Sequence, residues 1–273
     1  ANTAEARLRY YASQFSLVEV DSSYYSLPQE RTARLWACRT PEGFRFDVKA
    51  FRLFTHHPTP QEALPPDVRE GLPAELRQKE NVYLREMPRE LVEELWRRFE
   101  AALRPLGEAG RLGAVIFQCP PWFRPGRDSA AYLASLGEKV RFRAAVEFRN
   151  GAWLAGERRR GTVSLLRGCN LGYVCVDEPQ GFASSVPPVV EVTREDLAVV
   201  RFHGRNRETW EAKGLSAAER FNYLYSEEEL REWVPRLREL AGAAGEVHVL
   251  FNNCHQDKAV VNARQMLALL GLV

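Results

Sequence analysis

Carboxylates, arginines and a histidine stand at the ends of short apolar runs in this sequence. Glu147 and Arg149 end one run (AVEFR), and Arg201 and His203 end another (VRFH). Carboxylates and histidine are the usual groups for general acid–base catalysis, and arginine holds phosphate or carboxylate through paired hydrogen bonds. These residues predict a polar pocket that moves protons on an anionic or sugar-like small molecule.

The predicted catalytic residues are Glu147, Glu19 and His203. Side chains alternate along a strand, so Glu147 shares a face with Arg149, and Arg201 with His203. Each of these residues alone has a structural alternative, an ion pair at the top of the barrel or, for His203, a structural hydrogen bond, so the prediction is carried mainly by the whole set. The predicted substrate-binding residues are Lys49, Gln118, Arg149, Trp153, Arg201, Arg205, Asn252, Asn253, Tyr25 and His56.

We predict no cofactor, although a divalent-metal site is a competing interpretation. Glu19, Glu147, Asp177 and His203 offer the oxygen and nitrogen ligands that such a site uses. Arginines and Lys49 at neighbouring strand ends would repel a cation. The sequence also contains no glycine-rich phosphate loop and no dinucleotide fingerprint.

These residues must be positioned by alternating strands and helices. Seven β-branched or aromatic runs have the length of strands, and helical patterns separate them. The runs are Phe15–Asp21, Phe44–Ala50, Gly113–Cys119, Arg143–Phe148, Leu171–Asp177, Leu197–His203 and Glu246–Asn252. Steady alternation predicts a parallel β/α barrel of TIM-barrel type, whose working residues lie at the carboxyl ends of its strands.

Three helices are predicted with boundaries. Pro88–Leu106 carries one apolar stripe, Ser226–Leu240 opens with a capping-box pattern, and Asp257–Leu270 ends before Gly271. No linker divides the chain, so residues 1–273 are predicted to form one domain. The proline-rich segment Phe51–Met87 follows a strand and is predicted to be a loop or lid inserted into that domain.

Composition narrows the class of protein. The net charge of +2 disfavours a dedicated nucleic-acid binder. Five cysteines without a C-x-x-C pair favour free thiols in a reducing compartment. No apolar run reaches the roughly 20 residues that span a bilayer, and the charged start differs from a signal peptide. A cytoplasmic protein without a membrane partner is therefore expected.

The same strand-end residues resemble those of a known family. The segments are FSLVEVDSSYYSLP, FRFDVKA, FQCPPWF, AVEFRNGAW, VRFHGRN and FNNCHQDKAVVNA, in this order along nearly the whole chain. They are similar to the YecE-like family, catalogued as domain of unknown function 72. The resemblance implies a TIM-barrel-like fold but no reaction.

The sequence departs from that family at its start. The family usually opens with a Gly-Thr-Ser-Gly-Trp strand, which nothing before Phe15 resembles, and Asp21, Tyr24 and Cys119 replace its more usual Asn, Phe and Leu. Because an open barrel would expose two strand edges, we expect an upstream eighth strand to be missing from this sequence.

An enzyme is the favoured function, and its reaction class stays open among hydrolase, lyase and isomerase. A nucleic-acid-binding or nuclease-like barrel would use the arginines on phosphates and Tyr24, Tyr25 or Trp153 for stacking. A metabolite-binding protein without catalysis would use the same pocket. Fold alone does not choose among the three.

Overall fold

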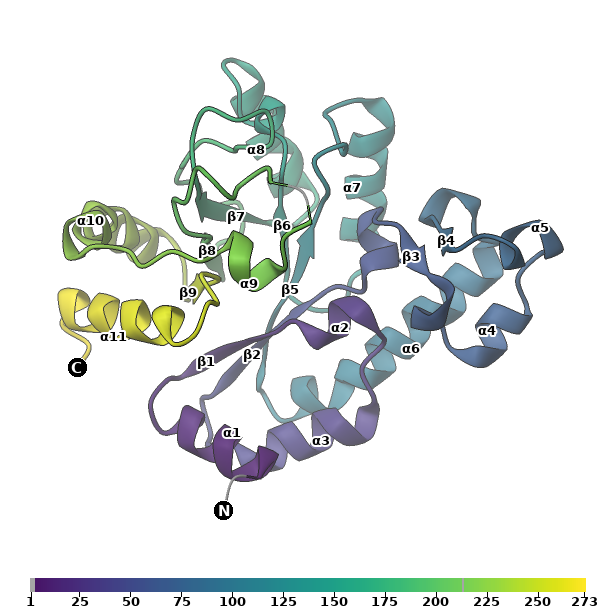
Figure 1. Cartoon of the computed structure of the whole chain (residues 1–273), viewed down its shortest axis with the longest axis horizontal. Helices are drawn as coiled ribbons and strands as arrows, with labels where there is room; N and C mark the ends of the chain where they lie inside the picture. The colour runs from purple at the N-terminus through teal and green to yellow at the C-terminus, as the bar shows by residue number, and fades with distance from the viewer. Residues whose placement is uncertain (1–2, 213) are drawn as a thin grey trace. The chain divides into compact units, whose positions relative to one another are not determined.

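The structure is a computed structural model that describes residues 3–212 and 214–273 (Figure 1). The chain divides into two compact units, residues 1–120 and residues 121–273. Each unit consists of parallel strands separated by helices, which confirms the predicted TIM-barrel-like α/β class. The extent of the predicted single domain stays a prediction.

The first unit contains three parallel strands in the order β1-β2-β5. These are β1 (Leu17–Val20), β2 (Arg45–Lys49) and β5 (Leu112–Gln118). The pairing of β2 with β5 shifts register between Phe46 and Val48. The buried carboxylate of Asp47 accepts a hydrogen bond from the Ala114 amide at 2.7 Å, which satisfies the backbone where the ladder is interrupted.

Helices cover these strands and build the core of the first unit. Its longer helices are α1 (Ala4–Ala12), α3 (Glu30–Arg39) and α6 (Arg89–Glu108). Helix α3 packs along α6, as Figure 1 shows. Trp36 of α3 stacks on Phe46 of β2 with ring centroids 5.7 Å apart. One short helix, α2 (Ser22–Tyr25), follows β1 directly.

The proline-rich segment is folded rather than extended. Its elements are η1 (Arg52–Thr55), β3 (Thr59–Pro60), η2 (Gln61–Ala63), α4 (Pro66–Glu70), α5 (Ala74–Arg77), β4 (Asn81–Val82) and η3 (Leu84–Glu86). The strands β3 and β4 pair antiparallel. Phe54 packs on Trp96 of α6, and the amide of Gln61 donates to the carbonyls of Leu76 and Arg77 at 3.0 Å. Whether this segment acts as a lid stays a prediction.

The second unit contains four parallel strands in the order β6-β7-β8-β9. These are β6 (Ala144–Glu147), β7 (Gly172–Asp177), β8 (Ala198–Phe202) and β9 (Val247–Phe251). Every residue of β6, β7 and β8 is buried, whereas β9 alternates between buried and half-buried positions. Continuous burial is typical of parallel strands that are covered on both faces.

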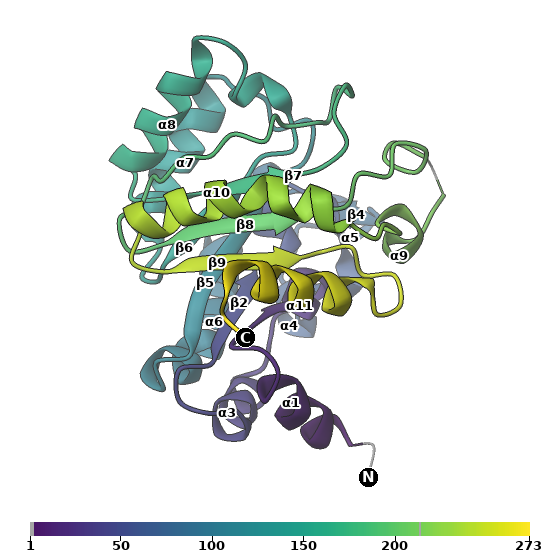
Figure 2. The same ribbon diagram turned by 90° about the vertical axis from the view of Figure 1, so that its left-hand side faces the viewer.

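The helices of this unit precede, separate and follow its strands in sequence. They are α7 (Arg127–Lys139), η4 (Gly151–Trp153), α8 (Arg158–Gly168), α9 (Ala217–Arg220), α10 (Glu227–Ala243) and α11 (Lys258–Leu270). Helices α10 and α11 pack side by side against β8 and β9 (Figure 2). Ser226 and Glu229 form the predicted capping box of α10, and Gly271 ends α11 in a left-handed conformation.

All seven predicted strands and all three predicted helices are present, with ends that differ by a few residues. Asp257 occupies the predicted N-cap of α11, but its side chain makes no capping hydrogen bond. In the part of the chain described, no helix combines the length and the apolar character required to cross a membrane.

Candidate functional site

The carboxylate of Glu147 is the centre of a buried charge cluster in the second unit. Glu147 ends β6 and is fully buried, as is Arg201 in β8. The guanidinium of Arg201 forms a salt bridge with Oε2 of Glu147. The other oxygen, Oε1, lies 2.7 Å from Nε of Arg149 and 3.1 Å from Nε2 of His203. Both carboxylate oxygens are therefore engaged by basic side chains.

Arg149 joins this centre to a second carboxylate, that of Glu178. Its Nη1 donates to Oε2 of Glu178 at 2.8 Å, and the other oxygen of Glu178 accepts from the Val186 amide at 2.7 Å. The side chain of Arg149 is 11% exposed, whereas those of Glu147, Arg201, His203 and Glu178 are completely buried. Arg149 is thus the one charged member of this five-residue cluster that reaches solvent.

His203 is held as a neutral imidazole. Its Nδ1 lies 3.1 Å from the side-chain nitrogen of Asn252 and 3.5 Å from Nη2 of Arg149, and both of these groups are donors. Nδ1 must therefore accept, which places the ring proton on Nε2 beside Glu147. The approach of Nε2 to Glu147 lacks the alignment of a hydrogen bond.

Burial and charge fix the protonation of the two central groups. Burial would raise the pKa of Glu147, but Arg201, Arg149 and His203 outweigh it and hold this pKa well below its usual value. Burial lowers the pKa of His203 to about 3, with a further contribution from Arg149, against the opposing effect of Glu147. At neutral pH Glu147 is therefore ionised and His203 is uncharged.

Glu178 is the group of this cluster that titrates near neutrality. Burial raises its pKa to about 7, although Arg149 and the Val186 amide favour the carboxylate. A carboxyl group that is half-protonated at neutral pH can both donate and accept a proton. The cluster therefore combines a fixed anion, two fixed cations and one exchangeable proton.

Aromatic side chains from the segment after β8 lie over this cluster. The ring of Trp210 is 5.3 Å from the guanidinium carbon of Arg149, and the ring of Phe221 is 5.8 Å from that of His203. The indole nitrogen of Trp210 donates to Ser184 at 2.9 Å. Ser184 in turn donates to Glu211 at 2.8 Å, which links this segment to the one after β7.

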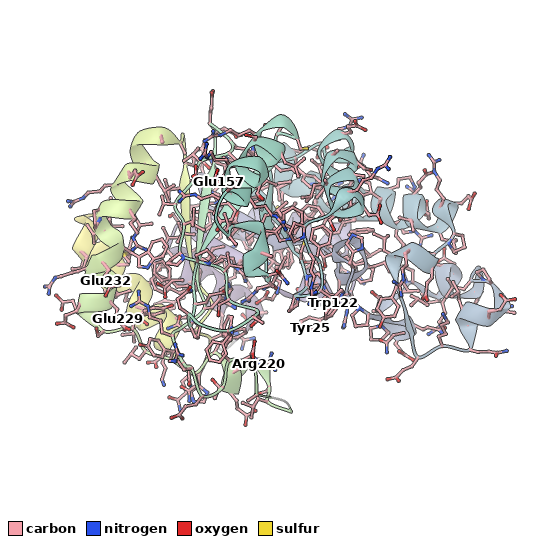
Figure 3. The ribbon with its side chains drawn as sticks, turned by 90° about the horizontal axis from the view of Figure 1, so that it is seen from above. Tyr25, Trp122, Glu157, Arg220, Glu229 and Glu232 are labelled. Atoms are coloured by element: carbon pink, nitrogen blue, oxygen red, sulfur yellow. The ribbon has the colours of Figure 1, made fainter. Side chains whose placement is uncertain are left out.

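Asp177, the residue before Glu178, belongs to a different cluster on the side of α10. Its carboxylate accepts from the hydroxyl of Tyr225 and the indole of Trp233, both at 2.7 Å, and from Arg205 at 2.8 Å. Arg205 also lies 2.9 Å from Glu232 and 3.5 Å from Glu229. These two acids sit near one another on α10 (Figure 3). Arg205, predicted to bind substrate, is thus surrounded by carboxylates.

Two further predicted binding residues have structural partners. Trp153 is 3% exposed, packs nearly parallel to Phe148 and Phe123, and donates to the Phe123 carbonyl at 2.7 Å. The indole of Trp153, which was predicted to stack on a ligand, therefore stacks on these two phenylalanine rings in the structure. Asn253 is fully buried and donates to the carbonyl of Tyr223 at 2.9 Å.

The remaining predicted site residues belong to the first unit. Lys49 ends β2 and lies 3.1 Å from Asp21, while Gln118 ends β5 and is half-buried. Glu19 lies within β1, in register with Asp47. His56 adopts a left-handed conformation after η1, where burial lowers its pKa, and Tyr25 is 58% exposed.

Sequence reasoning did not assign roles to Glu178, Trp210 and Phe221. Glu178 directly follows β7, so its place at a strand end was a signal, but nothing in the sequence separates it from Asp177. Trp210 and Phe221 lie in an irregular segment without a recognisable motif. Across residues 3–212 and 214–273, no three His, Cys, Asp or Glu side chains are grouped closely enough to hold a metal ion.

Comparison with known proteins identifies the family. The family described as "Protein of unknown function DUF72" matches residues 1–273. The chain belongs to the DUF72 family. A curated relative, UPF0759 protein YunF of Bacillus subtilis, is 33% identical over 98% of this chain and 88% of its own length.

Two solved DUF72 structures have the same fold. A DUF72 family protein from Enterococcus faecalis V583 matches with a TM-score of 0.79 at 27% identity, covering 99% of this chain and 96% of that one. One from Thermotoga maritima MSB8 matches with a TM-score of 0.76 at 31% identity, covering 98% and 90%. The predicted YecE-like, TIM-barrel-like resemblance is confirmed.

Proposed function

We propose that this DUF72 protein is an enzyme that moves a proton on an anionic small molecule, with Glu178 as the acid–base group. The observation that carries the proposal is that Arg149 bridges two carboxylates, the ionised Glu147 and the titratable Glu178. A carboxyl group with a pKa of about 7 has the protonation balance that general acid–base catalysis requires at neutral pH.

Arg149 is the proposed anchor for the anionic group of the substrate. It reaches solvent, and a guanidinium can hold a carboxylate or phosphate through two parallel hydrogen bonds. Binding of an anion to Arg149 would compete with Glu178 for the guanidinium. Glu178 would then be released next to the substrate and could exchange a proton with it.

Glu147, Arg201 and His203 act in this proposal by holding Arg149 in place. Glu147 has no oxygen left for a substrate proton, because basic side chains occupy both. The geometry therefore favours Glu178 over Glu147 as the acid–base group. Trp210 packs on Arg149 and is itself 6% exposed, so its ring covers one side of the guanidinium.

The substrates that suit this arrangement are carboxylated or phosphorylated small molecules, including sugar acids. Proton exchange beside a carboxylate or hydroxyl is a step shared by isomerases, lyases and some hydrolases. We further propose a cytoplasmic location, which the five cysteines support because none forms a disulfide among the described residues.

Solvent-deuterium exchange tests the proposal even when the product of the reaction is unidentified. The protein is incubated in D2O with a panel of hydroxy acids, sugar acids and sugar phosphates, and proton NMR follows loss of C–H signals. We expect exchange with at least one compound and a loss of about 100-fold in Glu178→Gln. Glu157→Gln, at an exposed surface glutamate, is the matched control. Equal exchange rates in wild type and Glu178→Gln, or no exchange with any compound, would overturn the proposal.

A further inference from the structure

Arg52 in the first unit is a half-buried arginine that pairs with no carboxylate in the part of the chain described. Its guanidinium lies 5.3 Å from the ring centroid of Tyr24, and its buried Nε finds no hydrogen-bond acceptor among the described residues. Among residues 3–212 and 214–273, no carboxylate pairs with it. Because removing a charge from water is costly unless it is compensated, an unpaired guanidinium in this setting favours an anion beside it.

A second cation lies against the same ring. Nζ of Lys49, at the end of β2, is 4.8 Å from the ring centroid of Tyr24, and its side chain is 13% exposed. Its partner Asp21 lies 3.1 Å away but is 54% exposed. Two cations thus contact the same aromatic ring, and the one carboxylate beside them, that of Asp21, is largely solvated. The group therefore carries an excess of one positive charge.

Side-chain hydrogen bonds tie together the backbone around these side chains. The buried hydroxyl of Ser23 lies 3.0 Å from the Val20 carbonyl and 2.7 Å from the Lys49 carbonyl, which ties α2 and Tyr24 to the end of β2. On the other side, Thr55 donates to the Arg52 carbonyl at 3.1 Å. A preorganised group of donors loses less entropy on binding.

His57 completes this arrangement next to Tyr24. Its ring meets the Tyr24 ring edge-on at 5.3 Å, and its Nδ1 lies 2.9 Å from the hydroxyl of Thr55. Tyr25, labelled in Figure 3, meets Tyr24 edge-on with ring centroids 5.0 Å apart, and 58% of its surface is exposed. An exposed ring beside two cations can contact the organic part of a phosphorylated or carboxylated ligand.

We propose that Arg52 and Lys49, positioned on Tyr24, bind the phosphate group of a small-molecule ligand. A phosphate offers oxygens to both cations at once, whereas a carboxylate offers two oxygens in one plane. This site lies within residues 1–120 and does not depend on the function proposed for Glu178. Lys49 and Tyr25 were predicted to bind substrate, and Arg52 is the residue that the structure adds.

Titration calorimetry at low ionic strength tests this site with three probes: inorganic phosphate, phenyl phosphate and benzoate. We expect both phosphates to bind and benzoate to bind at least about tenfold more weakly. Arg52→Gln should weaken phosphate binding by about tenfold or more, because it removes a charge-assisted contact. A preference for phenyl phosphate that disappears in Tyr25→Ala would identify a phosphate ester as the ligand, and equal affinity for the two phosphates would identify free phosphate.

The control is Arg89→Gln, which removes an arginine paired with Glu93 on the exposed face of α6 in the same unit. It should leave phosphate binding unchanged. If Arg52→Gln fails to fold, Arg52→Lys and Lys49→Gln provide the same comparison. The proposal is overturned if phosphate does not bind wild type, if benzoate binds as tightly, or if Arg52→Gln and Arg89→Gln bind alike. Loss of phosphate binding in Arg52→Gln and loss of proton exchange in Glu178→Gln are measured on different variants in different units, so either proposal can fail without the other.

Discussion

The guanidinium of Arg149 donates to the carboxylate of Glu178 at 2.8 Å while its Nε lies 2.7 Å from Glu147. One arginine therefore serves two acids that differ in protonation. Glu147 is held ionised by three basic neighbours, whereas burial raises the pKa of Glu178 to about 7. This difference separates a carboxylate that stays ionised from one that titrates near neutrality, and it leads to opposite expectations for substitution of the two residues.

Glu178→Gln should change how the stability of the protein depends on pH. The folded protein keeps the Glu178 proton up to about pH 7, whereas the unfolded chain loses it near the ordinary value of 4.5. Between these pH values the native state binds more protons, so rising pH lowers the free energy of unfolding of wild type. Glutamine does not titrate, so the variant avoids this loss in free energy of unfolding, which is on the order of 3 kcal/mol between the two pKa values.

Urea unfolding at pH 5, 6, 7 and 8 measures this effect. The difference in free energy of unfolding, Glu178→Gln minus wild type, should grow between pH 5 and pH 7 and then level off. Subtracting wild type removes the contributions of all other titrating groups. Parallel curves for the two proteins would show that Glu178 titrates normally.

Glu147→Gln should destabilise the protein at every pH near neutrality. It removes the buried counter-charge of Arg201 and one of the two carboxylate partners of Arg149. Breaking a buried ion pair from one side costs about 3–5 kcal/mol, because the remaining charge is left in the interior. The matched control is Glu157→Gln, since Glu157 is 88% exposed and pairs with an exposed arginine (Figure 3).

Chemical unfolding of both variants decides this prediction. Glu157→Gln should stay within about 0.5 kcal/mol of wild type. A Glu147→Gln protein as stable as this control would mean that the carboxylate does not hold the arginines together, and would restore Glu147 as a candidate acid–base group.

Which of the central residues share a face could be predicted from the sequence, because that depends on strand period alone. Residues two apart share a face, so Arg201 and His203 were expected on one face, and in the structure both reach Glu147. The seven strands and the capping box of α10 follow from equally local signals. Local pattern thus predicted most of the fold, while the roles predicted for the site residues stay predictions.

The partners of the other site residues could not be predicted, because they depend on contacts between residues far apart in the sequence. Asp177 and Glu178 are adjacent, and only packing shows that the first meets Trp233 of α10 while the second meets Arg149. Arg205 finds its carboxylates 24 to 28 residues away. The pKa of Glu178 depends on burial, which no spacing reveals.

Trp153→Ala should destabilise the protein strongly, because Trp153 is a core side chain. Its ring packs 4.5 Å from that of Phe148 and 5.6 Å from that of Phe123. Removing a buried tryptophan costs about 3–5 kcal/mol. Trp122→Ala is the control, because Trp122 is 57% exposed (Figure 3), and we expect it to cost less than about 1 kcal/mol.

Thermal and urea unfolding should therefore both show a much larger loss of stability in Trp153→Ala than in Trp122→Ala. If Trp153→Ala kept wild-type stability but lost ligand binding, the ring would serve the ligand, as its place after a strand end first indicated.

Gly204→Ala should be among the most damaging small substitutions in the chain. Gly204 follows His203 with φ of +84°, and a Cβ at this position would lie 2.6 Å from the Cβ of Tyr223. The amide of Gly204 also donates to the hydroxyl of Tyr225 at 2.8 Å, so the backbone has little freedom to shift. Gly156 has φ of +50° and open space around it, which makes Gly156→Ala a control for backbone strain alone.

We expect Gly156→Ala to cost about 1 kcal/mol and Gly204→Ala at least about 3 kcal/mol, measured by urea unfolding. The excess reports the steric contact with Tyr223, and a double-mutant cycle with Tyr223→Gly should recover part of it. Because His203 adjoins Gly204, the same variant should disturb the contact between Asn252 and His203, which the imidazole NMR signals would detect. Equal costs for the two glycine variants would mean that the segment over His203 yields easily, and that the charge cluster is less rigid than its packing implies.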